Sequence, residues 1–120
     1  MKAKSFNQKF SKVCDDVYAI VGEKETYSKE DAEVMLNGAT EIITKHFNIH
    51  AVRLSACQNR VASRSKNYAE KLAKTMGFEG AILALTFGIL EGTGEISENG
   101  GIKILSDASF NTGLKMSRDI

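Results

Sequence analysis

The sequence predicts a mainly α-helical domain with one C-terminal β-hairpin, an α+β fold, and three observations support this prediction. Apolar residues recur at steps of three and four along most of the chain, which is the period of an amphipathic helix. The 120 residues include no proline, the residue that most readily breaks a helix. Asn99-Gly100 lies between two short apolar alternations, and Asn-Gly is the preferred pair for a two-residue hairpin turn.

The first two predicted helices have the clearest pattern. Residues 4–21 place their apolar side chains on one face, and Gly22 follows as a stop signal. Ser28 then precedes a lysine and two acidic residues, which is typical of an N-cap followed by a favourable first turn. The second helix is expected to continue to Phe47, with Asn48 as its C-terminal cap.

The middle of the chain contains one ambiguous segment and two further predicted helices. Residues 49–62 leave two alternatives open, because the alternation over 52–56 fits a short strand and the small residues also fit a helix. A helix is predicted over 66–76 from its apolar stripe, with Gly77 at its end. The apolar segment 80–91 is predicted to be helical from its length and alanine content.

Length and composition indicate one globular domain, expected over residues 1–110, with the hairpin at 94–105 and a flexible tail at 111–120. The N-terminus has no apolar stretch typical of a signal peptide, and the longest apolar run is too short to cross a bilayer. We therefore expect a cytoplasmic protein without a membrane partner. Cys14 and Cys57 are expected to be reduced thiols, a single disulfide being the alternative.

The segment 80–91 is apolar on every side, so it needs cover on more than the face that packs on the core. The hairpin or a second molecule would supply the remaining cover. We therefore expect self-association, with a homodimer as the default, or a groove for a protein partner that the sequence does not identify. The expected interface residues are Ile82, Leu83, Leu85, Thr86, Phe87 and Ile89.

Positive charge is concentrated between residues 53 and 74, in a chain whose net charge is only +1. The first expectation is a solvated face whose charges pair within the fold or across a dimer. The alternative is a local basic surface that neutralises phosphates in a salt-sensitive way. Under the nucleic-acid alternative, the contacting residues would be Arg53, Arg60, Arg64, Lys66, Lys71 and Lys74. Tyr68 is the one aromatic residue here and belongs to the apolar stripe, so we expect no stacking on single strands.

The stretches AEKLAKTMGF and ILEGTGEISENGGIKIL, within residues 65–110, resemble the winged helix-turn-helix domain of the CRP/FNR type of transcription regulators. The resemblance covers about a third of the chain and implies a winged-helix-like fold in which the hairpin is the wing. The chain departs from that family in the recognition helix, because residues 79–85 contain no side chain able to make a bidentate contact to guanine or adenine. The expected wing also carries two acidic residues, Glu95 and Glu98, and one basic residue, Lys103. Its net negative charge would repel phosphates.

His46 and His50 have the i, i+4 spacing of two metal ligands on one helix face, and Cys57 and Cys14 would complete a tetrahedral set. Because Asn48 is expected to end the helix between the histidines, we expect no metal and no cofactor. The sequence contains no phosphate-binding glycine loop and no nucleophile motif with a positioned base, so no catalytic residue is assigned.

These observations predict a small non-enzymatic regulatory or accessory protein that acts through protein–protein interaction and self-association. The alternative is a winged-helix-like, DNA-binding transcription regulator that uses the basic 53–74 stretch. Charge reversal in the basic stretch separates the two functions from each other.

Overall fold

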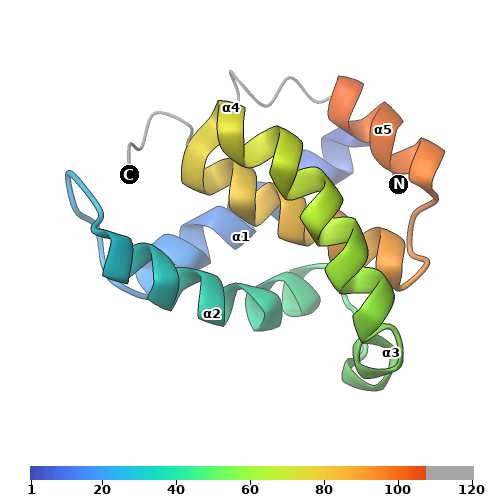
Figure 1. Ribbon diagram of the computed structural model, residues 1–120, viewed down its shortest axis with the longest axis horizontal. Coiled ribbons are helices and arrows are strands. Elements are labelled where there is room, and N and C mark those ends of the chain that lie inside the picture. The colour runs from blue at the N-terminus through green and yellow to red at the C-terminus, as the bar shows by residue number, and fades with distance from the viewer. Residues whose placement is uncertain (108–120) are drawn as a thin grey trace.

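The first two helices lie where the apolar spacing predicts them (Figure 1). The computed structural model describes residues 1–107, and in it α1 spans Ala3–Ala19 and α2 spans Lys29–His46. Ser28 caps α2 as predicted: its Oγ accepts a hydrogen bond from the Asp31 backbone N–H at 3.0 Å, and the Asp31 carboxylate accepts one from the Ser28 N–H at 3.1 Å. This reciprocal pair is a capping box, which satisfies two backbone donors that the helix leaves open.

Residues 49–62, for which strand and helix were both open, are helical. The short helix α3 spans Ala51–Ala56, and α4 begins at Gln58. The ring Nδ1 of His50 accepts a hydrogen bond from the Val52 backbone N–H at 3.2 Å and so caps α3. An isolated strand would have left its backbone groups without a ladder, because the described residues contain no other strand to pair with.

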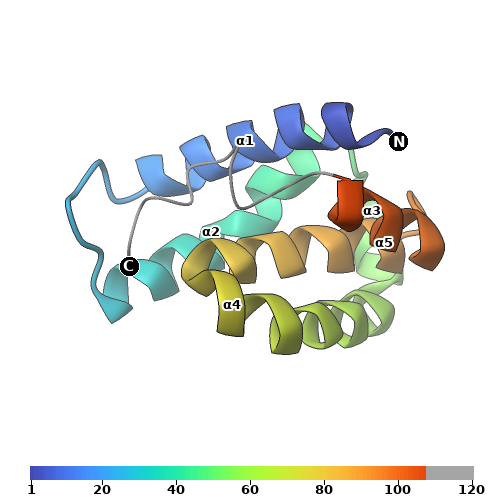
Figure 2. The ribbon, with the colours of Figure 1, turned by 90° about the horizontal axis from the view of Figure 1, so that it is seen from above.

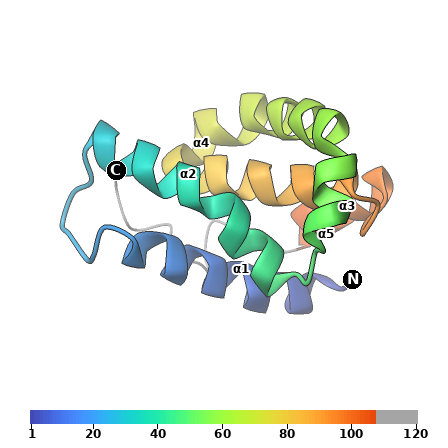
Figure 3. The same ribbon diagram turned by 90° about the horizontal axis from the view of Figure 1, so that it is seen from below.

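The helix α4 (Gln58–Gly92) doubles back on itself at Gly77, where φ is 67° and ψ is −138°. Only glycine adopts this backbone conformation readily, so Gly77 ends the first helical arm as predicted. We call residues 58–76 the first arm and residues 78–92 the second arm. Figure 3 shows the two arms running antiparallel, side by side.

Glycines let the two arms approach until their backbones almost touch. A Cβ atom at Gly88 would lie 2.7 Å from the Cα of Ser65, and one at Gly92 would lie 2.7 Å from the Cα of Val61. Both distances are well below any normal contact, so these positions accept no side chain unless the arms separate. A Cβ at Gly80 would likewise lie 2.3 Å from the backbone oxygen of Leu72, so close approaches occur at both ends of the paired arms.

The predicted β-hairpin at 94–105 is wrong, because the chain forms the helix α5 (Glu98–Asp107) there. Ser97 precedes the helix, and its Oγ accepts a hydrogen bond from the Gly100 backbone N–H at 2.9 Å, which is the bond of an N-cap. A type I′ turn would need positive φ at Asn99 and Gly100, and among the described residues neither has it.

Packing explains why helix prevails over hairpin in this segment. Gly101 and Ile104, three residues apart on α5, are both buried against the rest of the molecule, and Ile102 faces outward. A helix brings the first two onto one face, whereas a strand would place them on opposite faces. The described chain is therefore all-α instead of α+β, and the wing implied by the resemblance is not formed.

The second arm of α4 forms the centre of the core. Figure 2 and Figure 3 show it between α1 and the first arm, and α2 also packs against α4. The Phe87 ring stacks on Phe6 of α1 with centroids 4.9 Å apart and on Tyr68 of the first arm at 5.1 Å. One continuous aromatic stack thus connects the two sides of the molecule through the second arm.

By length and composition alone, α4 is apolar enough to cross a membrane, and 56% of that apolar window is buried inside the molecule. A core helix passes the same test, so the observation indicates a membrane span only weakly. The absence of a membrane partner stays a prediction.

Candidate functional site

The apolar residues predicted to form a dimer interface lie inside the molecule. The fully buried ones are Ile82, Leu83, Thr86, Phe87 and Ile89, and Leu85 is half-buried. The turn at Gly77 explains why these residues are buried and do not form an interface. It folds the first arm over the face of the second arm that α1 and α2 leave open. The cover that we expected from the hairpin or from a second molecule therefore comes from the first arm of the same chain. The fully buried side chains are therefore not available as an interface, and self-association stays a prediction without their support.

The basic residues do reach the surface, and the structure brings most of them together. Arg60, Arg64, Lys71 and Lys74 follow one another along the first arm with Asn67 between them, at steps of four, three, four and three. This spacing puts all five on one side of a helix. We call these five residues the basic face. It extends over about 21 Å at the helical rise of 1.5 Å per residue.

The other two predicted contacts, Arg53 and Lys66, lie outside the basic face. Arg53 belongs to α3, and its Nε donates a hydrogen bond to the backbone oxygen of Thr93 at 2.8 Å. It ties α3 to the end of the second arm. Lys66 is exposed on another side of the first arm. Neither residue is part of the row.

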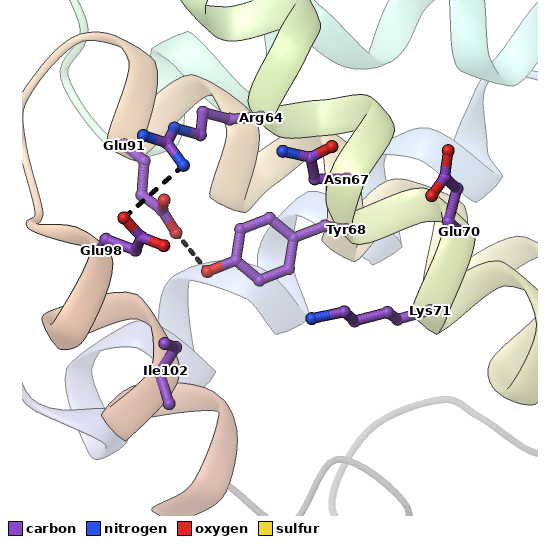
Figure 4. Close-up of a pocket in the computed structure, with 8 residues that line it drawn as sticks. All are labelled: Arg64, Asn67, Tyr68, Glu70, Lys71, Glu91, Glu98 and Ile102. Atoms are coloured by element: carbon purple, nitrogen blue, oxygen red, sulfur yellow. Dashed lines mark hydrogen bonds and ion pairs between the residues drawn. The ribbon is translucent and has the colours of Figure 1, made fainter.

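A pocket of about 240 Å³ opens beside the basic face (Figure 4). It lies where the first arm, the second arm and α5 meet, and three residues of the basic face contribute to it. The lining residues are Arg64, Asn67, Tyr68, Glu70, Lys71, Glu91, Glu98 and Ile102. No sequence pattern points to Glu91 or Ile102 as site residues, because they reach the pocket beside Tyr68 only when α4 folds back and α5 docks as a helix.

At one side of the pocket, the Tyr68 hydroxyl donates a hydrogen bond to the carboxyl group of Glu91. Glu91 is only 5% exposed. Gly101 of α5 lies over this pair, since a Cβ there would be 2.6 Å from Glu91 Oε2 and 2.9 Å from the Tyr68 hydroxyl oxygen. Arg64 Nη1 lies 3.6 Å from Glu98 Oε2, and both side chains are partly exposed, so this ion pair contributes little.

Burial raises the pKa of Glu91 above its ordinary value, and it outweighs the hydrogen bond from Tyr68 and the nearby Arg64, which both lower it. Burial, the hydrogen bond to Glu91 and that residue's charge together raise the pKa of the Tyr68 phenol. Both shifts thus come from the burial of the pair and from the contact between its two members.

Glu91→Gln is expected to flatten the dependence of stability on pH. The pKa of Glu91 is higher in the folded than in the unfolded chain, so its contribution is complete below the unfolded value of 4.5 and is lost as pH rises through the folded value. The glutamine does not titrate, so this loss disappears, at about 1.4 kcal/mol per unit of pKa difference. Urea unfolding between about pH 4 and 8 measures it. The exposed Glu95→Gln is the control, and identical pH profiles for both variants and the wild type would contradict the prediction.

The residues considered as metal ligands have other roles. His46 Nε2 lies 2.6 Å from Asp16 Oδ2 and joins α2 to α1, and His50 caps α3. Cys14 is buried in α1, Cys57 is half-buried at the start of α4, and no disulfide joins these two described residues. Within residues 1–107, no three His, Cys, Asp or Glu side chains are grouped to hold a metal ion. The structure therefore provides no support for the metal alternative.

Comparisons with known proteins assign no family to the chain. No family model matches it, and neither a curated protein nor a solved structure is similar enough to indicate a relationship. A function is therefore inferred from the basic face and the pocket beside it.

Proposed function

We propose that this protein is a small non-enzymatic accessory or regulatory protein that binds nucleic acid through the basic face. The observation that supports the proposal is the row of four cations on one exposed side of the first arm, in a chain of net charge +1. Cations in a row neutralise successive phosphates and release counterions, which supplies most of the affinity of sequence-independent binding.

The chemistry of the row suits phosphates. Arg60 and Arg64 can each hold a phosphate through two parallel hydrogen bonds, and Lys71 and Lys74 add point charges farther along the helix. Asn67 lies within the row and supplies an uncharged donor, which is a common contact to nucleic-acid backbones. No base-reading helix is needed for such binding, in agreement with the apolar, buried second arm.

Protein–protein interaction, the first expectation from the sequence, loses its main support. It depended on apolar side chains of segment 80–91 that the chain itself covers. The basic face instead favours an acidic partner, and nucleic acid is the partner whose charges recur along a line.

Replacing Arg60 and Lys71 together by glutamate is expected to weaken binding of a labelled oligonucleotide by about tenfold or more. Two phosphate contacts become repulsive. The slope of log affinity against log salt concentration should therefore decrease by about the contribution of two phosphate contacts. Fluorescence anisotropy with duplex and single-stranded DNA, at about 50 and 200 mM salt, measures both effects.

The matched control reverses Lys4 and Lys12, two exposed lysines of α1, because this gives the same net charge away from the basic face. We expect it to retain most of the binding. An equal loss in both double variants would indicate a response to net charge only, and no binding by the wild type at low salt would end the proposal. Circular dichroism of each variant confirms that the fold is intact.

A further inference from the structure

The pocket beside the basic face is lined by charges of both signs, unlike the basic face itself. Arg64 and Lys71 are opposed by Glu70 and Glu98, and the buried Glu91 shares a hydrogen bond with Tyr68. A phosphate therefore gains little by entering the pocket and remains better placed along the row of cations. A neutral, planar group is not repelled by the carboxylates of the pocket.

Tyr68 provides a flat aromatic surface in the middle of the pocket. One side of its ring stacks on Phe87, with centroids 5.1 Å apart and planes inclined by 22°. Figure 4 shows the ring at the centre of the lining residues, between Arg64 and Lys71 of the same arm. From the place of Tyr68 in the apolar stripe we expected no stacking on single strands, but the half-buried ring also lines the pocket, and this reverses that expectation.

The remaining wall comes from α5. Ile102 is 55% exposed although it is a large apolar residue, and it lines the pocket across from the first arm. An aliphatic side chain beside an aromatic ring is a suitable environment for the face and edge of a planar ring system. The volume of about 240 Å³ is below the range of about 300–1,000 Å³ that drug-sized ligands occupy, so it suits one such group.

We infer that this pocket receives one unpaired nucleobase, stacked on the Tyr68 ring, while phosphates of the same strand lie along the basic face. The inference rests on the proposed function and deepens it, because it names single-stranded nucleic acid as the partner. A base in a duplex is already stacked and paired and does not present its face to a protein ring. Stacking on an aromatic side chain tolerates any base, so no sequence preference is required.

The experiment compares two strands that differ only in their bases. One is a single-stranded deoxycytidine oligomer of about 12 nucleotides, and the other is an abasic strand of the same length and charge. The wild type is expected to bind the strand with bases about tenfold more tightly, which is the effect of one stacked base. Equal affinities with normal salt dependence overturn the inference and leave the proposed function standing. No binding of either strand at low salt overturns both.

Two variants of Tyr68 separate stacking from its hydrogen bond to Glu91. Tyr68→Leu removes the ring and should bind the two strands equally, whereas Tyr68→Phe keeps the ring and should retain the preference. Both variants lose the hydrogen bond, so a role that acts through Glu91 would affect both alike and overturn the inference. If Tyr68→Leu does not fold, ring-proton shifts of Tyr68 on titrating the wild type decide instead. Upfield shifts with the base-containing strand alone are expected, and identical shifts with the abasic strand overturn stacking.

Discussion

Gly88→Val is expected to unfold the protein or to lower its free energy of unfolding by about 3 kcal/mol or more. A Cβ at this position would lie 1.9 Å from Ser65 Oγ and 2.7 Å from both the Cα and the N of Ser65. Rotating the serine side chain relieves only the first contact, because the other two atoms belong to the backbone. The arms of α4 must therefore separate, which opens the core along their whole contact.

Urea unfolding monitored by circular dichroism measures this loss. The total free energy of unfolding of a domain of this size is about 5–15 kcal/mol, so the expected change is a large fraction of the stability. Ala62→Val is the matched control, since it adds bulk on the exposed side of the first arm. It should change the stability by about 0.5 kcal/mol or less. A Gly88→Val protein as stable as this control would show that the two arms do not pack as closely as the structure has them.

Phe87→Ala is expected to lower the free energy of unfolding by about 3–5 kcal/mol. Phe87 is fully buried between the rings of Phe6 and Tyr68, so its truncation leaves a cavity where three elements meet. Leu85→Ala is the comparison on the same arm, and because Leu85 is only half-buried we expect a clearly smaller loss.

The concentration dependence of the Phe87→Ala effect separates a core residue from an interface residue. If Phe87 lay between two subunits, unfolding would be coupled to dissociation and its midpoint would shift with protein concentration. We expect the loss to be the same at low and high protein concentration, since Phe87 is covered by its own chain. A loss that appears only where a dimer is populated would restore the interface predicted from the sequence.

Much of the helical structure was predictable because it depends on nearby residues. The capping box at Ser28 needs only the next three residues, and the end of the first arm at Gly77 needs only a backbone that glycine adopts readily. The extents of α1 and α2 follow from apolar spacing that repeats over several turns. Each of these signals is local, so it acts in the same way whatever the rest of the chain does.

The errors arose where local signals were short and distant contacts prevailed. Asn99-Gly100 is a good hairpin turn by itself, yet a helix there buries Gly101 and Ile104 together against the other helices. Segment 80–91 is apolar on all sides, as the sequence indicates, but the expectation that a hairpin or a second molecule covers it was wrong. The covering residues belong to the first arm, which the sequence does not show to fold back onto the segment.

The sequence by itself determined the extents of α1 and α2 and the end of the first arm at Gly77. It also determined that the segment 80–91 must be buried on all sides and that positive charge gathers between residues 53 and 74. Only the tertiary structure decided that the same chain buries that segment, that residues 98–107 are a helix, and that Tyr68, Glu91 and Ile102 share one pocket. The physical reason is that caps and periodicity act within one or two helical turns. The covering of an apolar face depends instead on how helices that are far apart in the sequence meet in space.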